Sequence, residues 1–315
     1  MELNQRLSLS RLPVCPLRLP RWIAPGCLCL FLFSGALGQE TAVPPPSLPA
    51  VEELLQKVRE NLHSNRFLLR QYTYNETQEI IQLNKKGEPQ KTKVRSYEVF
   101  PSIVEELIYR RLISKNGKPV EEKELRKQEK KYDEKVQKYA KKGRKRGLQA
   151  GSEYEAGEAE ALRKERDLIA EMLRLYHFKI QGRELLEVHT TLVVSFTPRP
   201  EFKSKIKDIK VLQKVRGRVW VSERDYQPVK VEAETLESIK FGWSILAKLE
   251  KGAHMVFQRR KVNDEVWLPD QASFRGSGRL LLLKEFRFQA TSKYSDYKKF
   301  SVASKISFEP AAIVK

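Results

Sequence analysis

The second half of the chain alternates between apolar and polar residues. From Val215 to Thr235, apolar side chains recur at every second position on both sides of a charged segment, Glu223 to Pro228. A period of two is the pattern of a β-strand with one dry and one wet face. A charged segment that ends in proline is typical of a hairpin loop. The pattern predicts a β-hairpin over 217–235 and assigns Trp220 to its polar face.

The same alternation predicts further strands on both sides of this hairpin. We expect strands near 67–83 and 92–100, then from 178 onward, with strands near 188–196, 202–211, 239–245, 255–257, 266–268, 280–288 and 294–302, and a strand or short helix at 103–114. No helix separates most neighbouring strands, so the sheet should be antiparallel. A sheet of about ten strands must curl or split. The fold class is therefore α+β, with a strongly curved antiparallel sheet that forms an incomplete β-barrel; a two-sheet sandwich is the alternative.

Two segments have the period of a helix instead. Residues 51–62 place Val51, Leu54, Leu55, Val58 and Leu62 on one stripe, which predicts an amphipathic helix for the sheet to wrap around. Residues 121–176 follow, and the first of them, 121–147, are rich in charge and poor in apolar residues. We interpret them as a helical insertion: a solvated helix over 121–147, a flexible segment over 143–157 and a second helix over 158–176.

The N-terminus has the layout of a secretory signal. Four arginines precede a short apolar run, and small residues around Ala36 and Gly38 follow it. We expect a signal peptide over 1–38, cleaved after Gly38, a proline-rich linker over 39–50 and a single domain over 51–315. The run is shorter than the ~20 residues that span a bilayer. These features predict a periplasmic or secreted protein.

Charge and composition narrow the chemistry. All three cysteines (Cys15, Cys27, Cys29) lie in the predicted signal, so the exported chain has no disulfide or cysteine metal site. The formal net charge of +20 favours anionic partners such as a membrane surface. Export makes nucleic acid the least suitable of them. The basic run Lys141, Lys142, Arg144, Lys145 and Arg146 is the candidate contact with an anionic surface.

Motifs for catalysis and for cofactors are absent from the sequence. Its four histidines are scattered, and no HExxH, GxSxG, P-loop or GxGxxG pattern occurs. We therefore expect no enzyme, no metal site and no cofactor; an exported hydrolase built from distant residues is the least favoured alternative.

The apolar face of the predicted sheet is the better candidate for a site. Ligand sites are apolar concavities with few polar groups, although the same face would equally serve as closed core. The candidate residues are Val219, Val221, Val229, Val231, Phe241, Trp243, Ile245, Met255, Phe257, Leu280, Leu282 and Phe286.

One segment carries a family resemblance. The sequence GRVWVSERDYQPVKVE, Gly217 to Glu232, resembles the recurring hairpin of the LolA/LolB-like lipoprotein-carrier superfamily. Gly182 to Pro200 and the Trp267-Leu268-Pro269 turn resemble the strands before and after it; residues 121–176 have no counterpart. The resemblance implies an incomplete barrel with an apolar cavity.

Together these observations predict an exported envelope protein that binds a lipid, or the acyl chains of a lipoprotein, in a half-barrel. Its partners would be that lipid or lipoprotein and an anionic membrane surface or envelope protein. The alternative is a non-enzymatic interaction or stress-sensor protein with a closed core.

Overall fold

The computed structural model describes residues 47–102, 104–149, 152–204, 207–241, 247–280 and 284–300. Residues from Ser47 onward form one compact unit. The predicted signal, residues 1–38, lies outside the described residues, as does most of the predicted linker.

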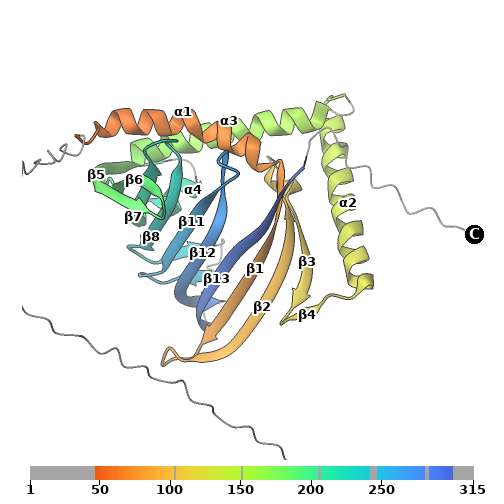
Figure 1. Ribbon diagram of the computed structural model, residues 1–315. Helices are drawn as coiled ribbons and strands as arrows, with labels where there is room; N and C mark the ends of the chain where they lie inside the picture. The colour runs from red at the N-terminus through yellow and green to blue at the C-terminus, as the bar shows by residue number, and fades with distance from the viewer. Residues whose placement is uncertain are drawn as a thin grey trace, which may run out of the picture. The chain divides into compact units, whose positions relative to one another are not determined.

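The described part is one sheet with helices packed against it (Figure 1). The helices are α1 (Val51–Leu69), α2 (Glu122–Lys145), α3 (Ser152–Leu175) and α4 (Lys207–Leu212), with a 3-10 turn η1 (Glu105–Leu107). The strands are β1 (Tyr72–Leu83), β2 (Pro89–Phe100), β3 (Tyr109–Lys115), β4 (Lys118–Pro119), β5 (Tyr176–Leu186), β6 (His189–Pro198), β7 (Val215–Ser222), β8 (Pro228–Thr235), β9 (Ile239–Phe241), β10 (Ala247–Leu249), β11 (His254–Val262), β12 (Val266–Leu280) and β13 (Lys284–Lys299).

The thirteen strands form a single antiparallel sheet that does not close on itself. Its order is β4-β3-β2-β1-β13-β12-β11-β8-β7-β6-β5, with β9 and β10 attached to β12. Among the described residues, β4 and β5 are the two edges of this path. The first and last strands, β1 and β13, pair in its interior. The predicted α+β fold with an open, curved antiparallel sheet is confirmed, and the sandwich is excluded.

The central hairpin forms as predicted, from β7 and β8. Directly paired residues share a face of the sheet, and successive residues alternate between faces. Leu192 of β6 pairs with Val221 and Val194 pairs with Val219. These four residues pack with Leu54 and Val58 of α1, so we call this side of the sheet the helix face and the opposite side the outer face.

Trp220 lies on the outer face, as its parity predicted, but it is buried. Its indole N–H donates a 2.7 Å hydrogen bond to Glu184. The Nζ atom of Lys230 and the guanidinium carbon of Arg218 lie 4.3 and 5.0 Å from the ring centroid. The polar face is therefore dry at this point, because two long basic side chains cover the indole.

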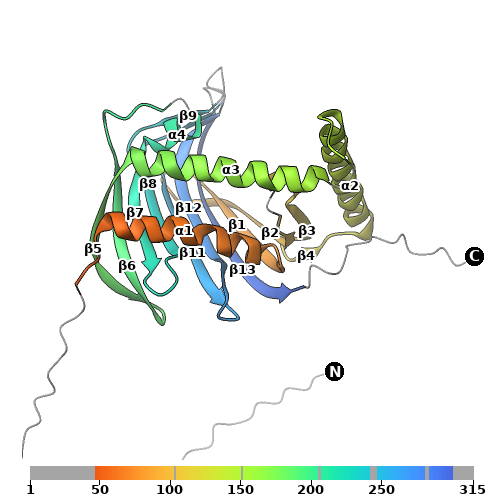
Figure 2. The same cartoon turned by 90° about the horizontal axis from the view of Figure 1, so that it is seen from above.

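Helices α1 and α3 lie side by side across the strands (Figure 2), and both contact β5. The predicted apolar stripe of α1 faces the sheet, with Leu54 almost fully buried. Leu175 at the end of α3, Tyr176 of β5 and Ile209 of α4 form a second buried cluster. The charged segment 121–176 thus supplies one of the two helices of the helix layer.

Several sequence-based boundaries were wrong. The segment Trp267-Leu268-Pro269, predicted as a turn, lies within β12, and residues 294–299, predicted as part of a separate strand, belong to β13. Three other differences concern the helices. Residues 67–69 continue α1, because Leu68 and Leu69 pack against Tyr72 and Leu268. The strand predicted at 202–211 is helix α4 at 207–212, which buries Ile209. The segment predicted as flexible, 143–157, is largely helical, since α2 runs to Lys145 and α3 begins at Ser152.

Close approach of two helices explains this last difference. A Cβ atom on Gly143 would lie 2.3 Å from the Cβ atom of Glu153, so α2 and α3 meet where only glycine fits. Tyr132 of α2 stacks on Tyr109 of β3 at 4.3 Å between ring centroids. The helix predicted as solvated is therefore docked along one side.

A buried amide attaches α1 to the sheet. The side chain of Asn65 is 7% exposed. Its Nδ2 donates to the carbonyl oxygen of Trp267 (3.0 Å), and its Oδ1 accepts from the Trp267 N–H (2.7 Å). The side chain of Asn65 therefore takes the place of a neighbouring strand. The N–H and C=O groups of Trp267 both depend on this side chain for their hydrogen bonds.

The loop between β7 and β8 reinforces this attachment. Asp225 accepts hydrogen bonds from the indole of Trp267 (2.9 Å) and from Lys261 (3.1 Å). Partial burial would raise the pKa of the Asp225 carboxyl, but these two hydrogen bonds outweigh burial and hold its pKa below the ordinary value.

We predict that Asn65→Ala destabilises the fold by about 2–4 kcal/mol, because it leaves the N–H and C=O groups of Trp267 buried without partners. Urea denaturation followed by circular dichroism measures the loss. Gln56→Ala, on the exposed side of the same helix, is the control and should change stability by less than about 0.5 kcal/mol. Equal effects of the two substitutions would contradict the role of the amide.

We predict that Asp225→Asn loses stability in a pH-dependent way. A carboxyl whose pKa is lowered on folding stabilises the fold above its unfolded pKa of about 3.9, and this contribution disappears as the pH falls through the folded value. The stability gap between wild type and variant should be constant from pH 5 to 7 and shrink below about pH 4. Denaturation curves across this range test it; a gap that widens in acid would refute the assignment.

Candidate ligand-binding face

The predicted site residues fall into three groups in the structure. Val219 and Val221 lie on the helix face beneath α1 and belong to closed core. Val229 is buried on the outer side with Trp220 and Trp267, because the register of β7 and β8 shifts beside it. Val231 pairs with Val219 on the helix face, and Met255, Phe257 and Phe286 lie on the same face farther from that core. Phe241 and Leu280 lie in β9 and β12 with side chains that are not described, and Trp243, Ile245 and Leu282 lie outside the described residues.

Strand register brings the third group together with residues that sequence reasoning missed. Met255 pairs with Phe274, and Phe274 pairs with Ala290, which pairs with Ile80. Phe288 lies between the pairs formed by Ala290 and Phe286 on the same face. We call the following set the apolar strip: Ile80, Val231, Met255, Phe257, Phe274, Phe286 and Phe288. Sequence reasoning missed Ile80, Phe274 and Phe288. Of these, Phe288 had a signal in the sequence, because it alternates with Phe286.

The apolar strip is only partly buried. Met255 is 42% exposed, whereas Val221 under α1 is 3% exposed. The other members of the strip are half-buried. Phe274 and Phe288 stack at 5.2 Å between ring centroids, and Phe286 follows at 5.7 Å from Phe288. The same face of one sheet is therefore closed in one part and open in another.

The helices explain this difference. Helix α1 contacts β12 near the start of that strand: Asn65 bonds to Trp267, and Leu68 packs against Leu268. The strip residues of β12 and β13 lie farther along those strands, which extend away from the helices in Figure 1. An apolar surface that is left partly open in this way is typical of a binding site.

Polar groups border the strip on the side of the helices. Glu76 of β1 accepts two hydrogen bonds from Arg110 of β3 and one from Ser292 of β13. Arg259 follows Phe257 on the same face, with its guanidinium carbon 5.7 Å from that ring. Burial lowers the pKa of Arg259, and the charge of Glu165 on α3 opposes this shift. The guanidinium stays charged at neutral pH.

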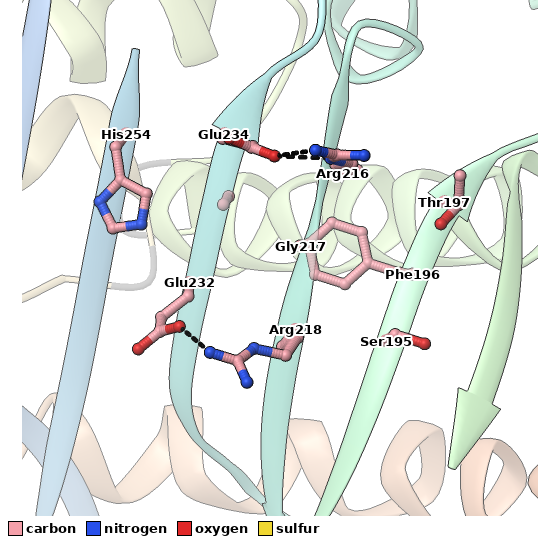
Figure 3. Close-up of a pocket in the computed structure, with 10 residues that line it drawn as sticks. Ser195, Phe196, Thr197, Arg216, Gly217, Arg218, Glu232, Glu234 and His254 are labelled. Carbon is pink, nitrogen blue, oxygen red and sulfur yellow. Dashed lines mark hydrogen bonds and ion pairs between the residues drawn. The ribbon is translucent and has the colours of Figure 1, made fainter. Parts of the chain in front are cut away.

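A hollow of about 320 Å³ lies elsewhere, over the glycine at 217 (Figure 3). Its charged residues pair with one another: Arg216 with Glu234 and Arg218 with Glu232. A Cβ atom on Gly217 would lie 2.0 Å from the Glu232 carbonyl oxygen, so the position requires glycine. Because its charges are neutralised internally, this hollow lacks the character of an apolar ligand site.

The described part of the chain holds no cluster of side chains that could bind a metal ion. No three His, Cys, Asp or Glu side chains there are close enough to hold a metal ion. His254 borders the hollow of Figure 3, and His189 packs edge-on against Trp267 at 4.8 Å. Among the described helices, none has the length and apolarity to cross a membrane.

The basic residues predicted to touch an anionic surface lie at the C-terminal end of α2. Lys141, Lys142, Arg144, Lys145 and Arg146 are all exposed. Arg146 is 3.5 Å from Glu160 of α3. The remaining four are directed to solvent on a helix that is docked along its other side.

We predict that a cysteine at position 255 is far more reactive than one at 221, although both positions lie on the helix face. In a background without the three native cysteines, Met255→Cys should react with a soluble thiol reagent at least roughly tenfold faster than Val221→Cys, since exposure controls access. Equal protection at the two positions would show that the face is closed.

Comparisons with known proteins were made at the levels of sequence and structure. No protein-family model and no curated protein sequence matches the chain. Among solved structures, a domain provisionally assigned as an outer membrane lipoprotein-sorting protein from Vibrio parahaemolyticus matches 81% of this chain and 95% of its own, with 13% identity and a TM-score of 0.34.

Two further structures match over a similar share. A LolA superfamily protein from Nitrosomonas europaea covers 81% of this chain and 96% of its own, with 10% identity and a TM-score of 0.31. A DUF1329 family protein from Desulfovibrio piger covers 85% of this chain and 100% of its own, with 12% identity and a TM-score of 0.31. At these scores, function has to be argued from the residues of this chain. One of these structures is described as a LolA superfamily protein, and the hairpin motif of the sequence resembles that superfamily.

Proposed function

We propose that this chain is an exported protein that binds an acyl chain, of a lipid or of a lipoprotein, on the apolar strip. The observation that carries the proposal is the contrast along one face of the sheet: Val221 is closed beneath α1, while Met255 and its phenylalanine neighbours stay partly open to solvent. Leaving such a surface in water is unfavourable unless something covers it.

An acyl chain fits the dimensions and chemistry of this surface. Across the sheet the strip extends over five strands, from Ile80 of β1 to Val231 of β8, which is about 19 Å at roughly 4.8 Å per strand spacing. Each methylene group buried there would contribute about 0.8 kcal/mol. Phenylalanine rings and the flexible thioether of Met255 adapt to a chain without fixed shape.

The charged groups of the helix face are consistent with an amphiphilic ligand. They lie beside the strip: Arg259, Glu76 and Arg110 on the side of the helices, and Lys93, which pairs with Ile80, on the side of β2. A ligand with an apolar tail and a polar head can therefore bury the tail without burying an unpaired charge. A closed core, which the alternative of an interaction or sensor protein assumes, is harder to reconcile with the exposure of Met255.

Export belongs to the same proposal. The predicted signal over 1–38 and the lack of cysteine after Cys29 suit a periplasmic or secreted protein. Such a compartment is where a carrier would protect an acyl chain from water between two membranes.

We predict that Met255→Arg weakens binding of a fluorescent fatty acid by roughly tenfold or more, because a charge on the strip would have to be desolvated by the ligand. Titration followed by probe fluorescence measures the dissociation constant. Leu185→Arg is the matched control, since Leu185 is 72% exposed on β5 and outside the strip. Circular dichroism establishes that both variants fold.

The two variants separate the outcomes. Weaker binding for Met255→Arg alone supports the strip as the site. Unchanged binding for Met255→Arg, or equal loss for both variants, would contradict it.

A further inference from the structure

Helix α2 has two faces of opposite character. Its docked face carries Tyr132, Tyr139, Ala140 and Gly143, which pack toward β3 and α3. Its other face carries lysines spaced four, four, three, four and three residues apart, a pattern that keeps them on one side of an α-helix. We call this set the lysine row: Lys127, Lys131, Lys135, Lys138, Lys142 and Lys145.

The lysine row is exposed, and one acidic residue of the same helix, Glu134, lies beside it. All six side chains are exposed. Ion pairs of α2 with its surroundings involve other residues, such as Glu124 with Lys115 and Glu129 with Arg111. Within the described part of the chain, none of the six lysines takes part in an ion pair. From Lys135 to Gln149 the sequence contains seven basic residues and no acidic one.

The geometry of the row is linear and firmly held. From Lys127 to Lys145 it extends over about 27 Å, at 1.5 Å per residue. Gln128 fixes the first part of the helix, since its side-chain amide donates to the carbonyl oxygen of Leu112 (3.1 Å) and accepts from the Leu112 N–H (2.8 Å). The close approach of Gly143 to Glu153 fixes the last part. Figure 1 shows α2 flanking β3 and β4 at the edge of the sheet, and all six lysines are exposed to solvent there.

We propose that the lysine row docks the protein on an anionic phospholipid bilayer. A straight row of like charges on a rigid helix complements a flat, negatively charged surface, and each lysine near such a surface adds to the attraction. Single-stranded nucleic acid would need aromatic platforms for base stacking, but the tyrosines of α2 are on its docked face. This function goes beyond acyl binding and involves a different surface.

The test is vesicle co-sedimentation of the full chain at low salt. Vesicles of phosphatidylcholine alone are compared with vesicles in which three parts in ten are phosphatidylglycerol. Any apolar insertion contributes to both, so the difference between them reports charge. We expect binding to the anionic vesicles that falls steeply as salt is raised.

Two quadruple variants assign that binding to the row. The first, Lys131→Gln, Lys135→Gln, Lys138→Gln and Lys142→Gln, retains good helix formers and should weaken anionic-vesicle binding roughly 1,000-fold. The control removes the same charge from the exposed lysines of the β1–β2 hairpin: Lys85→Gln, Lys86→Gln, Lys91→Gln and Lys93→Gln. It should bind within about threefold of wild type, since these lysines lie outside the row.

Three results would overturn the proposal: no preference for anionic vesicles, equal loss in both variants, or tight binding to heparin or DNA without vesicle binding. Met255→Arg should retain vesicle binding, so failure of acyl binding and failure of membrane docking are distinguishable.

Discussion

Two side-chain amides determine where the helices of this protein lie. Asn65 of α1 bonds in both directions to the backbone of Trp267, and Gln128 of α2 bonds in both directions to the backbone of Leu112. Each amide takes the place of a neighbouring strand, which a backbone group needs when water is excluded. Hydrogen bonds of this kind fix position more strictly than apolar packing does, since apolar contacts tolerate sliding while donor and acceptor geometry does not.

The position of α1 divides the helix face of the sheet. On one side, Leu54 and Val58 complete a core with Leu192, Val194 and Val221. On the other side the strands continue beyond the helices, and Met255 remains 42% exposed beside half-buried phenylalanines. A sheet with uniform alternation thus has two parts with different roles, one that stabilises the fold and one that is available to a ligand. Charge is divided in a similar way, with paired charges on the outer face and unpaired lysines along α2.

The elements of the fold that could be predicted from the sequence are those that a local pattern of residues specifies. The hairpin of β7 and β8 needs only alternation and a charged turn, and both are visible in the sequence. Helix α4 was mistaken for a strand because a six-residue segment has no clear period; its formation depends on burying Ile209 against Leu175 and Tyr176. Trp220 could not be predicted as buried, because its cover comes from Arg218 and Lys230.

The candidate site, too, could be predicted in part. Parity placed Met255, Phe257 and Phe286 on one face, but whether that face is open depends on where α1 stops covering it. The one signal for this was Asn65, a polar residue that continues the apolar stripe of Leu54, Val58 and Leu62. A polar side chain in such a stripe indicates a specific buried partner, yet periodicity alone does not say which strand provides it.

The measurement that tests the central claim most directly is photo-crosslinking with a fatty acid that carries a diazirine near the end of its chain, followed by peptide mass spectrometry. The structure predicts adducts on β11, β12 and β13 at Met255, Phe274 and Phe288, and competition by unlabelled fatty acid. Adducts confined to the outer face, or labelling that unlabelled fatty acid does not reduce, would contradict an acyl-binding face.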